Sequence, residues 1–420
     1  EGGSGVQRWV KFAKYLPSFN WQPVVYTPSN PQRKTTDESL LDEIPPEAEI
    51  IKRPITEPYG IYRKLMGKDS STDMKTLTYT GITGKGSFKQ RLSLYIRSNF
   101  FIPDPRVWWV RPSVKFLREY LREHPVDAIV TTGPPQSMHL IGLNLSRETG
   151  LPWISDFRDP WTGMYWFDRM GLSWRSERMH RRMEKAVLDG STAVLAVTPM
   201  VREDFIKMTA TRVEMITNGY DEDDFTERVE PDGFFNVTHT GIFPADGNPV
   251  NLWKTLSDKC SSDGEFKSRL RIRLVGSTDQ GVLESIGEAG LSPNVINRGY
   301  LSHAEAVAEQ KAASLLVLPL RNAPGYKAIL PGKLFEYVAA SCPVLGIGQT
   351  DGAMAELLRE TDAGIVCDWD DARSVRSYID SCWEKFKSGT LSGTARDYEK
   401  YSRRRLTAAL VNLMEDITKS

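Results

Sequence analysis

The stretch Ser314-Leu-Leu-Val-Leu-Pro-Leu320 is an apolar run, followed by a polar loop over 321–330 and then by Pro331-Gly-Lys-Leu-Phe-Glu-Tyr-Val-Ala-Ala340. A short apolar run predicts a buried strand of a parallel sheet. Pro331 suits the start of a helix, because its missing N–H would have no partner there. Strand, loop and helix in this order form the repeating unit of an α/β fold.

The start of this predicted helix is a candidate anion site. Free N–H groups and the positive end of the helix dipole favour a phosphate. Lys333 would add a point charge beside Gly332, and Glu336 a carboxylate that can hold sugar hydroxyls. A phosphate site next to a hydroxyl-binding carboxylate suits a nucleotide-sugar. The alternative is an ordinary α/β unit with both side chains on a solvated face.

Strands and helices alternate along the rest of the chain. The acidic run Asp221-Glu-Asp-Asp224 and the turn residues up to Gly233 predict a linker. We therefore expect an α/β protein with two Rossmann-like domains, whose parallel sheets face a cleft. The expected domains are 1–220 and 236–395, joined by a linker over 221–235, and a last helix that begins near 395 and takes up 396–420 is expected to cross back to the first domain. Further strands are expected at 23–27, 126–132, 151–155, 192–198, 213–217, 235–239, 271–275, 343–347 and 363–366.

The chain opens with a glycine-rich loop, Glu1-Gly-Gly-Ser-Gly5, which leads directly into a helical pattern. Gly3, Ser4 and Gly5 would let backbone N–H groups approach a diphosphate or an acceptor closely, or they form a plain tight turn. Such a loop normally follows a strand, so the first strand of the sheet is expected to be missing from this sequence.

The composition excludes several classes of protein. The 420 residues carry 54 Lys and Arg and 54 Asp and Glu, and a net charge of zero argues against a nucleic-acid binder. The four cysteines are not spaced as a zinc site or a redox motif, which favours a reducing compartment. No apolar stretch approaches the roughly 18 residues of a membrane span, and no signal peptide opens the sequence. We expect a cytoplasmic protein.

The chain resembles the GT-B glycosyltransferases of family 4, of the kind that build bacterial surface polysaccharides. The motifs that carry the resemblance are Gly2 to Arg8, Gly133-Pro-Pro135, Asp156-Phe-Arg-Asp-Pro-Trp161, Ile216-Thr-Asn-Gly219, His239-Thr-Gly241 and Pro331-Gly-Lys-Leu-Phe-Glu-Tyr337. The resemblance implies transfer of a sugar from a nucleotide donor to a glycan or lipid-linked acceptor, with retention of configuration and without a metal or other cofactor. It places the donor in the second domain and the acceptor in the first.

Two features depart from the family's donor site. Similar enzymes carry two glutamates eight positions apart, and Glu336 matches the second, whereas Ala328 stands in place of the first. Relatives also place basic residues after the glycine loop that ends at Gly241, but here none follows until Lys254. The leaving diphosphate needs positive charge, so the expected donor residues are Glu336, Lys333, Gly332, Lys327, Asn218, His239 and Gly241, with Arg321 as another candidate cation.

The acceptor-side candidates follow a short predicted strand. Asp156, Arg158 and Asp159 form a polar cluster at its carboxyl end, where open α/β sheets bind ligands. We expect Asp159 to orient or deprotonate the acceptor hydroxyl and Arg158 to meet a phosphate or hold the carboxylates. The alternative is a structural salt-bridge cluster. His139 lies in an apolar helix and is expected to pack rather than act as a base.

Two motifs are expected to be misleading. Asp221-Glu-Asp223 fits a metal-binding DxD pattern, but it lies in the linker and is expected to cap a helix or face water. Gly3-Ser-Gly5 suggests a dinucleotide site, but the third glycine of that motif is replaced by Arg8.

A membrane contact is a further hypothesis. The basic residues of 85–97 alternate with apolar ones, and two tryptophans follow, which suits an anionic membrane surface or a helix packed on its own domain. The residues concerned are Lys85, Lys89, Arg91, Arg97, Phe88, Leu92, Leu94, Ile96, Phe100, Phe101, Trp108 and Trp109.

The sequence therefore predicts a cytoplasmic glycosyltransferase, located in part at the inner face of the membrane. Two alternatives remain open at this point. A nucleotide-sugar epimerase or phosphorylase would share the fold, and the missing carboxylate at Ala328 would suit a non-catalytic binding protein.

Overall fold

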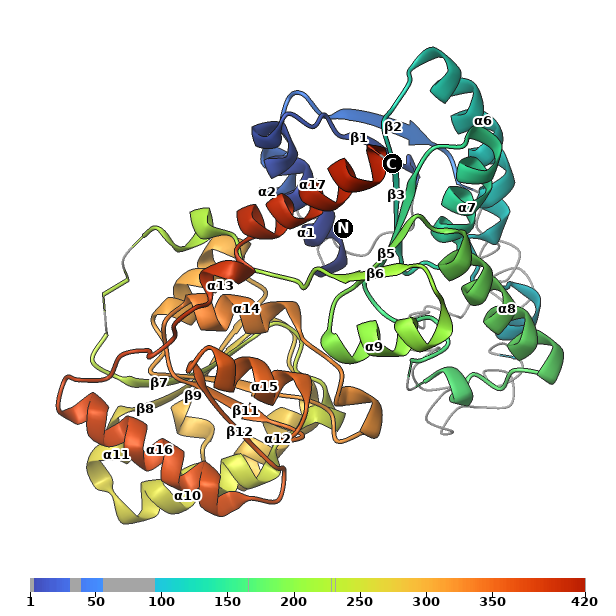
Figure 1. Ribbon diagram of the computed structural model, residues 1–420. Helices are drawn as coiled ribbons and strands as arrows, with labels where there is room; N and C mark the ends of the chain where they lie inside the picture. The colour runs from blue at the N-terminus through green and yellow to red at the C-terminus, as the bar shows by residue number, and fades with distance from the viewer. Residues whose placement is uncertain are drawn as a thin grey trace.

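The computed structural model describes residues 4–30, 39–55, 95–164, 166–227, 229–230 and 232–419. They form two α/β domains with parallel sheets, and the last helix returns to the first domain (Figure 1). The predicted fold class is confirmed.

The N-terminal domain contains two parallel sheets. The larger has the strand order β3-β4-β5-β6, and β1 pairs only with β2 among the described residues. The elements are α1 (Ser4–Tyr15), β1 (Val24–Pro28), α2 (Ser39–Asp42), β2 (Glu49–Arg53), α6 (Val110–Glu123), β3 (Ile129–Gly133), α7 (Ser137–Thr149), β4 (Trp153–Phe157), α8 (Trp174–Gly190), β5 (Ala193–Ala196), α9 (Pro199–Met208) and β6 (Arg212–Met215).

The C-terminal domain contains one parallel sheet with the order β12-β11-β10-β7-β8-β9. A 3-10 helix, η4 (Glu222–Phe225), lies in the linker before it. The elements are β7 (Phe235–Thr240), α10 (Val250–Ser262), α11 (Gly264–Arg269), β8 (Leu270–Val275), α12 (Gln280–Glu288), β9 (Val295–Gly299), α13 (His303–Lys311), β10 (Leu315–Pro319), α14 (Gly332–Ala339), β11 (Val344–Ile347), α15 (Ala353–Glu360), β12 (Gly364–Cys367) and α16 (Ala372–Lys387), and α17 (Arg403–Thr418) ends the chain.

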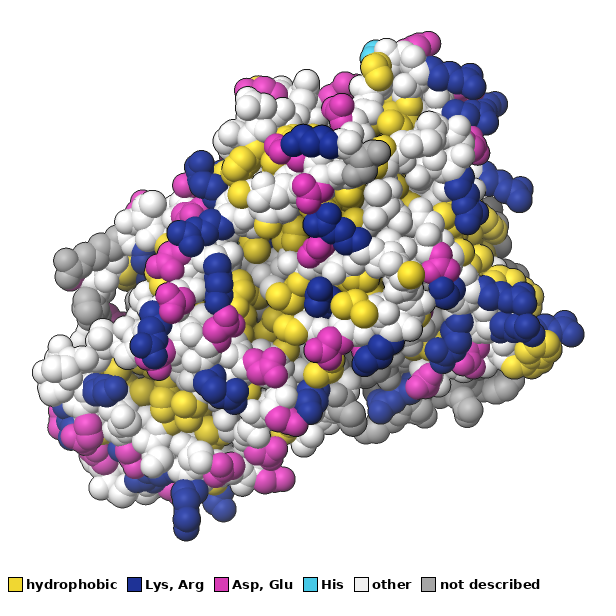
Figure 2. Space-filling model, in the orientation of Figure 1, with side chains coloured by type: hydrophobic (Ala, Val, Ile, Leu, Met, Phe, Trp, Pro, Cys, Tyr) yellow, Lys and Arg dark blue, Asp and Glu magenta, His cyan; other side chains and the backbone are white. Residues whose placement is uncertain are grey.

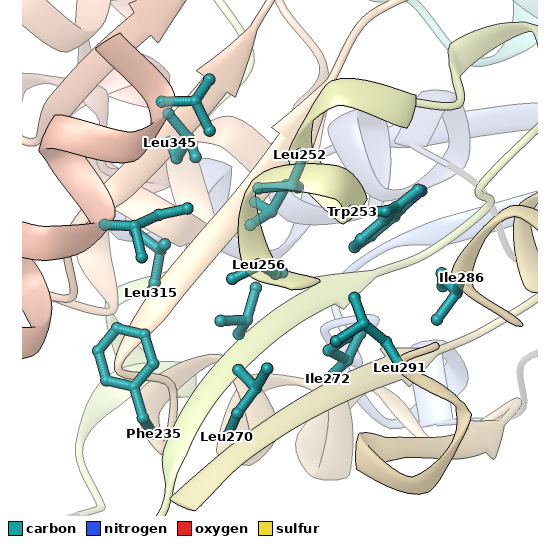
Figure 3. Close-up of a cluster of buried hydrophobic side chains, with 14 of the residues drawn as sticks. Phe235, Leu252, Trp253, Leu256, Leu270, Ile272, Ile286, Leu291, Leu315 and Leu345 are labelled. Carbon is teal, nitrogen blue, oxygen red and sulfur yellow. The ribbon is translucent and has the colours of Figure 1, made fainter. Parts of the chain in front are cut away.

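The central strand β10 is buried on both faces. Leu315 and Val317 belong to a cluster with α10, α11, α12 and α16, part of which is drawn in Figure 3. Leu316 and Leu318 pack on the opposite face against α14 and α15. Since alternate side chains of a strand point to opposite faces, two covered faces require a continuous apolar run.

The sheet β3 to β6 is also covered on both faces. One face packs on α7, α8 and α9 through residues such as Trp153 and Phe157. The other face packs on α1 and α17, where Leu410 is fully buried beside Ile154. The C-terminal helix thus belongs to the N-terminal core, as α17 and α1 lie together in Figure 1.

The chain crosses between the domains at two adjacent places. Tyr220 and Ser402 form a parallel bridge, and Tyr220 exchanges backbone hydrogen bonds with Tyr401 and Arg403. Gly219 allows this contact, because a Cβ atom there would lie 2.1 Å from the carbonyl oxygen of Tyr401.

Some elements differ from the prediction. The edge strand β9 was not predicted, because polar residues such as Asn297 and Arg298 are exposed there and no apolar run marks it. The short strand β2 was missed for the same reason. The last helix begins at Arg403 instead of near 395, since the Ser402 hydroxyl caps it by accepting the N–H of Arg405. The missing first strand and the domain boundaries stay predictions.

Candidate functional site

A cavity of about 300 Å³ lies between the two domains. Its N-terminal wall contains Arg158 and Asp159 after β4, Thr198 after β5 and Asn218 after β6. The opposite wall is the loop from Gly325 to Gly332 that precedes α14. Because the carboxyl ends of parallel strands meet at one edge, this is where an α/β sheet binds ligands. The cavity brings together predicted acceptor-side and donor-side residues.

Arg158 shapes the acceptor wall. Its backbone N–H and its Nε atom donate to the carbonyl oxygen of Gly133, at 3.0 and 3.2 Å, and its guanidinium also donates to Pro134. The side chain therefore holds the Gly133-Pro134-Pro135 turn in place while it lines the cavity. Burial raises the pKa of the neighbouring Asp159 carboxyl above its usual value, with Arg158 opposing, so Asp159 is suited to accept a proton.

Asp156 lies below this wall, with no exposed surface. Its carboxylate binds the buried guanidinium of Arg8, with an Arg8 Nη2 to Asp156 Oδ1 distance of 2.9 Å, and it accepts from Trp9 and Thr132. Burial would raise the pKa of Asp156, but Arg8 and these hydrogen bonds lower it below the usual range. Asp156 was predicted beside Asp159 as a catalytic candidate, whereas its place in the structure is that of a positioning residue.

The segment after Asp159 is held by α8, which the sequence analysis did not single out. Glu184 accepts the backbone N–H groups of Trp161 and Thr162, at 3.2 and 3.1 Å, and the Thr162 hydroxyl. His180, one turn earlier, accepts the indole N–H of Trp161 at 3.0 Å. A His and a Glu four residues apart share one helix face, and that spacing was the available signal.

Lys333 lies on α14, and its side chain reaches the carboxyl end of β7, on the predicted donor side of the cleft. Its Nζ atom donates to the carbonyl oxygen of Thr240 at 2.5 Å and lies 3.3 Å from Nε2 of His239. Burial lowers the pKa of Lys333 to about 8. Burial and the charge of Lys333 also lower the pKa of His239 to about 3, so this histidine is neutral.

Two glycines keep the strand ends open next to Lys333. Gly241 has φ +93°, and a Cβ atom there would lie 2.8 Å from the Lys333 Nζ atom. Gly276 follows β8 with φ +107°, and its Cβ would lie 2.5 Å from the carbonyl oxygen of Gly241. Positive φ and close approach both require glycine. The missing side chains leave room for a phosphate group beside the cation.

Glu336 lies one turn after Lys333 on α14. Its Oε2 atom accepts from Gln310 at 2.9 Å, and Gln310 also donates to the Thr240 hydroxyl. The hydroxyl of Tyr337 accepts the Thr240 N–H at 2.8 Å. These contacts fix α14 against the end of β7 and leave Glu336 partly exposed.

The remaining predicted residues are spread over the molecule. Lys327 pairs with Asp351, and Arg321 pairs with Asp246 at 3.0 Å. Ser4 and Gly5 begin α1, whereas Gly3 lies outside the described residues. Asp221 caps η4 and also binds Lys11, Lys14 and Tyr15. His139 is buried and stacked on Phe157. In the described part of the chain, no group of three or more His, Cys, Asp or Glu residues is arranged to hold a metal ion.

Two family models match the chain. Residues 91–219 match a glycosyl transferase 4-like domain, and residues 256–385 match glycosyl transferases group 1. The chain belongs to the GT-B glycosyltransferases of the family 4 type. The predicted resemblance is confirmed. In this glycosyltransferase the first matched region lies in the N-terminal domain and the second in the C-terminal domain, one on each side of the cleft. No curated protein sequence matches it.

Solved structures share the fold of this glycosyltransferase at low identity. Anabaena HepE in complex with UDP-glucose is 14% identical, with a TM-score of 0.59 over 99% of this chain and 96% of that one. The UDP-forming trehalose-phosphate synthase of Burkholderia xenovorans, in complex with glucose-6-phosphate, is 11% identical, with a TM-score of 0.61 over 99% and 96%. WaaG, a glycosyltransferase of lipopolysaccharide biosynthesis, is 14% identical, with a TM-score of 0.51 over 100% and 95%.

We expect Asp156→Asn to destabilise the N-terminal domain strongly. Removing one partner leaves the charge of Arg8 buried and uncompensated, which costs about 3–5 kcal/mol. Urea denaturation would measure the change in the free energy of unfolding.

Asp416→Asn is the matched control, because it removes an ion pair with Arg212 whose side chains are 45% and 60% exposed. Exposed pairs contribute about 0–1 kcal/mol. Equal losses in the two variants would contradict the role given to the buried pair.

Proposed function

We propose that this glycosyltransferase moves a sugar from a nucleotide-sugar donor to a hydroxyl group of a glycan or lipid-linked acceptor. The transfer proceeds with retention of configuration and without a metal ion, in the synthesis of a surface polysaccharide. The enzyme acts in the cytoplasm, with a peripheral contact to the inner face of the membrane.

The observation that carries this proposal is the cavity between Asp159 and the start of α14. The donor diphosphate would lie on the bare backbone of Gly241 and Gly276, next to the ammonium group of Lys333. A fixed cation stabilises the negative charge that the leaving diphosphate gains in the transition state. Lys333 thus supplies the charge that relatives draw from basic residues after their glycine loop.

Asp159 and Arg158 would act on the acceptor. A carboxyl whose pKa is raised by burial is a suitable acceptor for the hydroxyl proton. Arg158 holds the turn beside it, and its charge opposes the protonation of the Asp159 carboxyl. Closure of the two domains over the cavity would exclude water and align donor and acceptor.

The substrates of the structural neighbours guide the choice of donor and acceptor. HepE binds UDP-glucose, and WaaG serves lipopolysaccharide synthesis. We therefore place a uridine nucleotide first among the donors and a glycolipid first among the acceptors. A non-catalytic binding role is the alternative, favoured by Ala328, which lines the cavity where relatives have a carboxylate.

We expect one nucleotide among UDP, GDP, dTDP, ADP and CMP to bind saturably in isothermal titration calorimetry. Glu336→Gln should lower the affinity for that nucleotide 10- to 100-fold, because hydrogen bonds from ribose hydroxyls to a charged group contribute about 1.5–3 kcal/mol.

Glu356→Gln, on the exposed face of α15, is the matched control and should bind like the wild type. No binding of any nucleotide would favour the non-catalytic role. Equal affinity in both variants would remove Glu336 from the donor site.

We expect the affinity for the nucleoside diphosphate to fall as pH rises through the pKa of Lys333. The ammonium group is charged below about pH 8 and loses its proton above it. A ligand that requires the charged form loses roughly tenfold in affinity between pH 8 and pH 9.5. Calorimetry over this range would measure the slope.

Lys333→Gln should bind the nucleoside diphosphate weakly, with an affinity that does not change over this pH range. Lys327→Gln should keep the pH dependence of the wild type, because Lys327 pairs with Asp351. The same slope in both variants would assign the titration to another group.

Retention is measured on the product. We expect the proton NMR coupling constant of the new anomeric centre to match that of the donor sugar, and an inverted coupling would contradict this part of the proposal.

A further inference from the structure

The outer face of α8 is basic, although the whole chain has no net charge. An open hollow of about 800 Å³ is lined by Arg178, Arg181, Arg182 and Lys185 of α8 and by Arg147 of α7, together with Glu177 and Asp189. Figure 2 shows these dark-blue side chains gathered where α8 lies in Figure 1.

Part of this charge has no protein partner. Arg181 and Lys185 form pairs with Glu177 and Asp189 along the helix. Arg147, Arg178 and Arg182, in contrast, form no ion pair or hydrogen bond with any residue that the structure describes. Five basic and two acidic side chains line the hollow, so it keeps a net positive charge that suits an external anion.

Exposed apolar side chains adjoin the basic face. Trp174, at the first position of α8, is 67% exposed, and Phe100 is 72% exposed. Asn99 joins their two segments, because its side chain accepts the N–H of Ser173 and donates to the carbonyl oxygen of Gly171. Ile96, Trp108 and Met179, on the same two segments of the chain, are also exposed. Trp109, which was expected to join them, is buried. Lys85, Lys89 and Arg91 lie outside the described residues.

We propose that the outer face of α8, together with Trp174 and Phe100, docks on an anionic lipid bilayer. Arginines without partners would meet the phosphate headgroups, and the aromatic rings would enter the interface. A nucleic acid would also match the charge, but it would leave the exposed apolar area uncovered. The bilayer accounts for both features.

The two faces of α8 link this surface to the acceptor. The buried face carries His180 and Glu184, which hold Trp161 and Thr162 next to Asp159. The acceptor wall therefore lies about one helix diameter, roughly 10 Å, from the docked lipid surface. An acceptor anchored in that bilayer would present its hydroxyl group at the cleft without leaving the membrane. This inference rests on the proposed function, and it names the acceptor's class as lipid-linked.

Vesicle flotation tests the docking surface. We expect the full chain to float with vesicles of phosphatidylcholine and phosphatidylglycerol and to stay behind with phosphatidylcholine alone. Arg178→Gln/Arg182→Gln should lower the partition coefficient roughly 30-fold, since each basic residue near an anionic surface contributes about 1 kcal/mol. Phe100→Ser/Trp174→Ser should also lower the partition coefficient, because it removes the two aromatic rings that enter the interface.

Arg359→Gln/Arg373→Gln removes two exposed arginines of the C-terminal domain and should float like the wild type. Equal flotation of the wild type and the α8 variant, or no preference for anionic vesicles, would overturn the inference. Calorimetry with the nucleotide distinguishes failure of the docking inference from failure of the proposed function. Nucleotide binding without flotation would contradict the docking surface alone, and flotation without nucleotide binding would contradict the proposed function instead.

Discussion

The guanidinium group of Arg8 uses its donors on two strands at once. It binds the carboxylate of Asp156 at the end of β4 and the carbonyl oxygens of Ile216 and Thr217 after β6. Burying a charge of this kind costs several kcal/mol unless every donor is satisfied. With four hydrogen bonds, Arg8 fixes α1 to the strand ends, and the segment with Asn218 is fixed to α1 in turn.

From this contact the structure extends to both sides of the cleft. The segment that Arg8 holds after β6 leads to Gly219 and the first crossing between the domains. The returning chain around Tyr401 packs against Gly219. Further along α1, Lys11 and Lys14 bind Asp221 at the start of the linker. The cleft is thus aligned by groups that never reach it. The position of the Lys333 ammonium group also depends on the space around it. Gly241 leaves room for this group, because a Cβ atom at that position would collide with it.

The features that could be predicted from the sequence are those that leave a local pattern. Strand β10 was predicted because both of its faces are buried, and β9 was missed because an edge strand can be polar. The pairing of Arg8 with Asp156 could not be predicted, since the two residues are 148 positions apart and Arg8 stands in an ordinary helix. The same limit applies to Trp108 and Trp109, neighbours in sequence of which one is 45% and the other 4% exposed.

The placement of α17 has a consequence for the order of folding during translation. One face of the sheet of the N-terminal domain is covered by Leu406, Leu410 and Leu413, residues that are translated after the C-terminal domain. The C-terminal domain, from β7 to α16, is complete before they emerge. Domains usually fold in the order in which they are synthesised. In this protein the N-terminal domain is translated before the C-terminal domain but closes its core after it, so its uncovered sheet face must persist in the nascent chain until α17 emerges.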